Sequence, residues 1–219
     1  AIDYGLDFYA PQTLESPDGR RIMIAWMQSW ESSHDHTYIG KWFGMMTLPR
    51  ELSLKEGRLI QKPVRELEKY RQNGVFYTDV DVQQRLQLPS VQGRCVDMTV
   101  NVHPSGGRLY DKFIIKVAKD TRFYTSIIYE PGESILTFDR GRSGLRRDIV
   151  STREAVTRFR DGRITLRIIL DRFSVEIFVN DGEQALSSTL YTDLSAEGIS
   201  FEAEGVAIID VEKYDIVMP

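Results

Sequence analysis

The segment ITLRIILDRFSVEIFV, residues 164–179, decides the fold class. Its two apolar halves flank the polar dipeptide Asp171-Arg172, an arrangement that predicts a β-hairpin with a short connection. In the second half, Val175, Ile177 and Val179 share one face, because side chains alternate along a strand. That face needs a second layer to bury it, so the hairpin belongs to a larger β structure.

Apolar runs of strand length recur along the whole chain, separated by turn formers such as Glu56-Gly57, Asp161-Gly162 and Asn180-Asp181-Gly182. This spacing is typical of an all-β protein of roughly a dozen strands. The clearest predicted strands cover residues 21–27, 113–118, 123–129, 164–170, 173–179 and 206–217.

One stretch, residues 64–75, has the features of a helical linker. Pro63 suits a first helical position, Val64 and Leu67 share a face, and Asn73-Gly74 is a stop signal. The linker divides the chain into residues 1–63, the size of one four-stranded propeller blade, and residues 76–219, the size of an antiparallel β-sandwich.

Composition excludes several classes of protein. The net charge is -4, with basic residues scattered rather than gathered in a stripe, so nucleic acid is not an expected partner. No run of about 18 apolar residues predicts a membrane segment. Cys95 is the single cysteine, which rules out an internal disulfide and favours a reducing, cytoplasmic location.

Four ordered motifs carry a family resemblance. They are DYGLDFYAPQ (residues 3–12), RIMIAWM (21–27), GMMTLPREL (44–52) and LDRFSVEIFVNDG (170–182). Together they resemble glycoside hydrolase family 32, the invertases, sucrose-6-phosphate hydrolases, inulinases and levanases. The resemblance implies the last blade of a five-bladed β-propeller followed by a C-terminal β-sandwich.

The resemblance also implies a retaining β-fructosidase that needs no cofactor and no metal. The family places its nucleophile, stabilising aspartate and acid/base glutamate in W-M-N-D-P-N-G, R-D-P and E-C motifs, and none of these motifs occurs in the sequence. Because the apolar start, residues 1–9, also suggests a cut chain, we expect a C-terminal part that is inactive alone. The alternative is a non-catalytic sandwich that mediates assembly or binds carbohydrate through exposed tyrosines (Tyr110, Tyr124, Tyr129 and Tyr191).

The resemblance suggests three substrate-binding residues. Asp3 matches the aspartate of the family's D-x-G motif, although a turn aspartate before Gly5 is the plainer interpretation. Asp7 is either a pocket residue or a cap at the start of a strand. Trp26 could stack on a sugar ring at the pocket rim or simply pack in the core.

For three further groups of residues, the sequence favours a structural or solvent-exposed role over a functional site. His34 and His36 form a weak ligand pair in a polar segment. Asp171 and Glu176 would face opposite sides of a strand, so a structural role is expected for them. A cluster of arginines could bind a phosphate or an acidic partner, but a solvated loop is the expected role (Arg140, Arg142, Arg146 and Arg147).

A single propeller blade would expose surfaces that neighbouring blades normally cover. The expected partners are therefore a fructose-containing saccharide in the longer enzyme, and either the missing N-terminal propeller part or a second copy of the chain.

Overall fold

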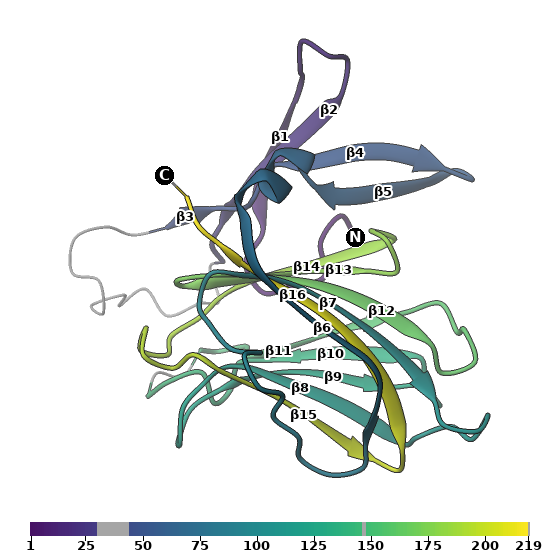
Figure 1. Cartoon of the computed structure of the whole chain (residues 1–219). Helices are drawn as coiled ribbons and strands as arrows, with labels where there is room; N and C mark the ends of the chain where they lie inside the picture. The colour runs from purple at the N-terminus through teal and green to yellow at the C-terminus, as the bar shows by residue number, and fades with distance from the viewer. Residues whose placement is uncertain (30–43, 146–147, 219) are drawn as a thin grey trace.

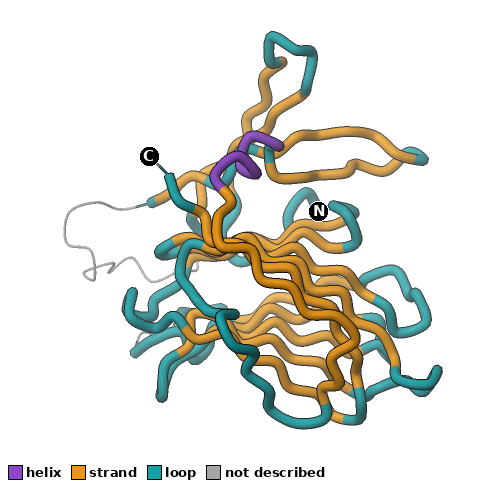
Figure 2. Tube along the Cα trace, in the orientation of Figure 1, coloured by secondary structure: helices purple, strands orange, loops and turns teal. Residues whose placement is uncertain are grey.

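The computed structural model describes residues 1–29, 44–145 and 148–218, which form three antiparallel sheets and one short helix (Figure 1). Almost every regular element is a strand, as Figure 2 shows. The all-β prediction is confirmed. No helix among these residues is long and apolar enough to cross a membrane.

The first sheet, which we call the blade, lies within residues 1–63 and has the strand order β1-β2-β4-β5, with β3 paired to β2. Its strands are β1 (Tyr9–Glu15), β2 (Arg21–Met27), β3 (Met45–Met46), β4 (Arg50–Lys55) and β5 (Arg58–Pro63). Glu56 and Gly57 both adopt positive φ between β4 and β5, the geometry of a tight two-residue hairpin turn.

The other two sheets form a β-sandwich (Figure 1). The six-stranded sheet has the order β14 (Gln184–Thr189), β13 (Ser174–Val179), β12 (Ile164–Asp171), β7 (Val96–Pro104), β16 (Ala207–Ile216), β6 (Arg71–Val82). The five-stranded sheet has the order β11 (Thr152–Val156), β10 (Ile135–Asp139), β9 (Thr125–Glu130), β8 (Lys112–Lys119), β15 (Gly198–Glu204).

The predicted hairpin forms between β12 and β13. Asp171 pairs with Ser174, so the connecting residues are Arg172 and Phe173, one position later than expected. Val175, Ile177 and Val179 are buried in the sandwich core, as alternation predicted.

The opposite face of β13 is also buried, which alternation alone did not predict. Phe178 joins a second apolar cluster with Ile169, Ala185 and Leu67, and Leu48 of the blade packs against it. This strand therefore has the sandwich core on one face and the junction with the blade on the other.

The segment predicted as a helical linker, residues 64–75, is only partly helical. A 3-10 helix covers Arg65–Tyr70, and β6 begins at Arg71. Asn73-Gly74 does not end a helix. The register between β6 and β16 shifts there, and both residues lie opposite Tyr214 as a β-bulge, with Asn73 at φ 51°.

Candidate functional site

Asp3 lies at the junction between the blade and the sandwich. Its side chain is 1% exposed. One carboxylate oxygen accepts hydrogen bonds from the backbone N–H groups of Gly5 (2.8 Å) and Ser187 (2.9 Å). The other accepts from the Ser187 hydroxyl (2.8 Å) and from Arg50 Nη1 (2.9 Å). Asp3 thus makes the turn contact expected before Gly5 and also joins the N-terminal segment to β14.

Arg50 is the centre of this junction. Its fully buried guanidinium forms ion pairs with Asp3 (2.9 Å) and with Glu176 of β13 (2.7 Å), and it donates to Gln61 Oε1 (3.0 Å). Its charge also lies over the rings of Phe8 and Phe178, 5.0 and 5.3 Å from the centroids. Residues from both parts of the chain therefore share one buried cation.

Burial governs the electrostatics of the ion pair between Arg50 and Glu176. Burial by itself disfavours the charged form of Arg50, but the Glu176 and Asp3 carboxylates keep the pKa of Arg50 above its ordinary value. Burial raises the pKa of Glu176, and the contacts with Arg50 and with the Leu48 N–H (2.6 Å) oppose that shift. Each charge depends on the others for its compensation.

Asp7 forms a second buried cluster with Arg140 and β14. The Asp7 carboxylate pairs with Arg140 and accepts from the backbone N–H and the hydroxyl of Thr189, both at 2.8 Å. Arg140 also pairs with Asp148 (2.8 Å). The prediction of a solvated arginine loop is wrong for Arg140, which is buried because it neutralises these two acids.

Trp26 lies on β2, on the less buried of that strand's two faces. Its ring contacts Tyr9 of β1 edge to face, with centroids 6.1 Å apart. Gly44 lies against the indole, since a Cβ on Gly44 would come within 2.5 Å of Trp26 Nε1. The structure therefore places Asp3 and Asp7 against β14, and places Trp26 on the blade beside Tyr9.

The buried carboxylates suit structure rather than glycoside hydrolysis. A retaining glycosidase needs one carboxylate as nucleophile and one protonated carboxyl group as acid, about 5 Å apart. Asp3 and Glu176 instead share Arg50, and Asp7 is held by Arg140. Such fully paired groups fix the position of the N-terminal segment on the sandwich.

Several predictions from sequence concern other positions. His34 and His36 lie outside the described residues, as do Arg146 and Arg147.

Two of the tyrosines proposed as carbohydrate platforms, Tyr110 and Tyr129, are 1% exposed and belong to the sandwich core. They are not available for stacking on a sugar, which weakens the carbohydrate-binding alternative.

Arg50 is the central residue of the junction that the sequence patterns did not predict. A usable signal was present, because Glu176 is the single acid in the apolar run 173–179 and a buried acid needs a cationic partner. Nothing local identifies that partner, which lies 126 positions away.

Comparison with known proteins places this arrangement in a family. The family model described as glycosyl hydrolases family 32 N-terminal domain matches residues 1–63, and the one for the family 32 C-terminal part matches residues 66–216. Raffinose invertase of Escherichia coli is 37% identical over 212 residues, which cover 95% of this chain and 42% of that protein. Sucrose-6-phosphate hydrolase of Staphylococcus xylosus is 32% identical, covering 98% of the chain and 43% of that protein.

Solved structures share the fold. Fructan 1-exohydrolase IIa of Cichorium intybus, also solved in complex with 1-kestose, superposes with a TM-score of 0.83 at 20% identity. The match covers 98% of this chain and 49% of that one. The chain spans less than half the length of the raffinose invertase and of the sucrose-6-phosphate hydrolase. With both of its parts matched by the family's models, the chain belongs to glycosyl hydrolase family 32.

Proposed function

We propose that this chain is the C-terminal part of a retaining β-fructosidase, comprising the last propeller blade and the sandwich. The observation that carries this proposal is that the family's N-terminal and C-terminal models match consecutive parts of the chain, residues 1–63 and 66–216. The substrate class would be a saccharide with a terminal β-fructosidic bond, such as sucrose, sucrose 6-phosphate, inulin or levan.

Within that enzyme, the 219 residues would supply scaffold rather than the reacting carboxyl groups. The absence of the W-M-N-D-P-N-G, R-D-P and E-C motifs supports this division, as does the ion pairing of Asp3, Asp7 and Glu176. Trp26 is the residue we propose for the rim of the saccharide site, because it is aromatic and only partly buried. Direct contact of Asp3 or Asp7 with the sugar stays a prediction from the resemblance.

The first test is enzymatic. The purified 219-residue chain is expected to release no fructose from sucrose, sucrose 6-phosphate or inulin above the rate of a buffer control. The product of the whole source gene is expected to hydrolyse at least one of them, with intact mass measured on both samples. Fructose release by the 219-residue chain would contradict the scaffold role, and a gene without the three motifs would contradict the β-fructosidase assignment.

The blade is also expected to associate with the missing propeller part. Six of the seven residues of β1 are exposed, and apolar side chains on the blade lie open (Leu14 at 55%, Met46 at 55%, Leu54 at 79%). Because neighbouring blades bury such surfaces in a propeller, we propose the N-terminal propeller part as the occupant.

Light scattering tests this association. The 219-residue chain alone is expected to self-associate, and a separately expressed N-terminal part, when one is added, is expected to replace self-association by a one-to-one complex. A chain that stays monomeric at high concentration and does not bind the N-terminal part would show that the blade's surface needs no partner.

A further inference from the structure

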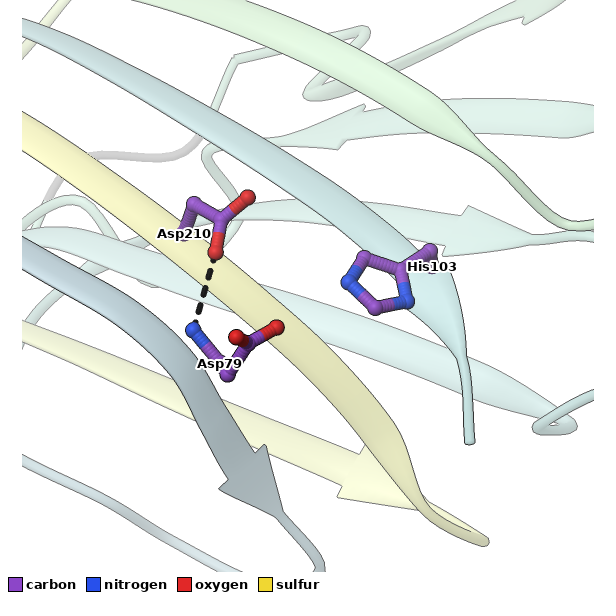
Figure 3. Close-up of side chains that lie close together, drawn as sticks. All are labelled: Asp79, His103 and Asp210. Carbon is purple, nitrogen blue, oxygen red and sulfur yellow. Dashed lines mark hydrogen bonds between the residues drawn. The ribbon is translucent and has the colours of Figure 1, made fainter. Parts of the chain in front are cut away.

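Three side chains from three neighbouring strands meet on the outer face of the six-stranded sheet (Figure 3). Asp79 comes from β6, His103 from β7 and Asp210 from β16, the strand between them. One ligand atom from each lies within 4.8 Å of the other two. We propose that these residues bind a divalent transition-metal ion, with Zn²⁺ as the test ion.

Strand pairing explains why they meet. In the β16–β7 pairing, Asp210 lies opposite Asn101, and His103 lies two positions along on the same face. In the β16–β6 pairing, the register shifts between Ile209 and Val211, which leaves Asp79 in a bulge beside Asp210. The Asp79 N–H donates to the Asp210 carboxylate at 2.9 Å, and that bond fixes the bulge against the acid.

The imidazole is oriented in the manner of a metal ligand. His103 Nδ1 lies 3.4 Å from the carbonyl oxygen of Pro104. A proton on Nδ1 would point at that carbonyl and leave the lone pair on Nε2, the nitrogen that Figure 3 shows on the side of the two aspartates. Metal-bound histidines commonly donate their second N–H to a backbone carbonyl in this way.

The donor set suits a small borderline cation. One imidazole nitrogen and two carboxylate oxygens leave a fourth position for water, as in open zinc sites. Bonds of about 2.0–2.2 Å place tetrahedral ligands roughly 3.3–3.6 Å apart, so the ion would draw the three side chains closer together. The Asp79 side chain is exposed and can rotate toward the ion, whereas His103 and Asp210 are half-buried.

Charged side chains also lie near the cluster. A cavity beside the cluster is lined by His103 and Asp210 together with Arg160, Asp161 and Arg163. Arg160 pairs with Glu183 at 2.5 Å, so its charge is already compensated. A bound ion would join β6, β7 and β16 to one another, and by mass action it would stabilise the folded sandwich.

Equilibrium dialysis against Zn²⁺, with the metal per chain determined by mass spectrometry, tests the site. The background for all samples is the 219-residue chain with His34→Gln, His36→Gln and Cys95→Ser, which removes every other imidazole and the thiol. We expect one Zn²⁺ per chain and a thermal unfolding midpoint that rises with Zn²⁺ concentration.

Variants of the cluster decide the assignment. In that background, His103→Gln and Asp210→Asn are each expected to weaken Zn²⁺ binding by about tenfold or more and to abolish the midpoint shift. His103→Cys, which keeps a zinc ligand, is expected to retain binding. Glu154 is an exposed acid on the other sheet, so Glu154→Gln is the matched control. It is expected to leave both Zn²⁺ binding and the midpoint shift unchanged. Absence of stoichiometric Zn²⁺ from the background chain, or binding unchanged in His103→Gln, would overturn the proposal.

Discussion

Replacing Arg50 by Met is expected to lower the free energy of unfolding by about 3–5 kcal/mol, because removal of one partner leaves buried charges uncompensated. The substitution keeps much of the apolar volume and removes the cation. Asp3 and Glu176, 1% and 3% exposed, would then be two buried carboxylates without the cation that they share. The damage should therefore concentrate at the junction.

Urea unfolding followed by two signals checks this result. All three tryptophans belong to residues 1–63, so tryptophan fluorescence reports that part of the chain, while circular dichroism reports the whole chain. The matched control is Arg21→Ala, which breaks the exposed pair with Glu15 (49% and 66% exposed) and should cost no more than about 1 kcal/mol.

A triple variant separates lost charge compensation from lost packing. Arg50→Met combined with Asp3→Asn and Glu176→Gln is expected to recover part of the lost stability, since none of these three positions then carries a buried charge. Equal effects of Arg50→Met and Arg21→Ala would show that the buried cluster contributes little.

Replacing Gly182 by Ala is expected to cost about 2–5 kcal/mol, the sum of left-handed backbone strain and a steric clash. Gly182 has φ +96°, and a Cβ there would lie 2.2 Å from the carbonyl oxygen of Gln61 on β5. That contact is backbone against backbone, and the Gln61 N–H donates to the Gly182 carbonyl at 2.9 Å. The blade strand would have to move away from the sandwich turn.

Gly19→Ala is the matched control for Gly182→Ala. Gly19 has φ +80°, and a Cβ there would meet nothing within 4 Å, so the control carries backbone strain alone, about 1–2 kcal/mol. The difference between the two variants in urea unfolding measures the close approach of β5 to the turn. If Gly182→Ala were no less stable than Gly19→Ala, the junction between β5 and the turn would have to accommodate the added Cβ with little loss of stability.

The sequence by itself determined the fold class, the turns and the family. Strand alternation placed Val175, Ile177 and Val179 in the core, and Asn180-Asp181-Gly182 forms a turn with positive φ at all three residues. These features depend on neighbours within a few positions, so local physics is sufficient to predict them. The four ordered motifs then identified the family that the comparisons show.

Tertiary structure alone decided what covers each strand and which charges meet. Alternation distinguishes the two faces of β13 but does not reveal that the blade buries the second one. Asp3 and Ser187 are 184 positions apart, and Asp79 and Asp210 are 131 apart, yet each pair is joined by a hydrogen bond. Such contacts follow from strand order, register and bulges across the whole chain, because a side chain's local sequence fixes its direction on a strand and not the partner that it meets.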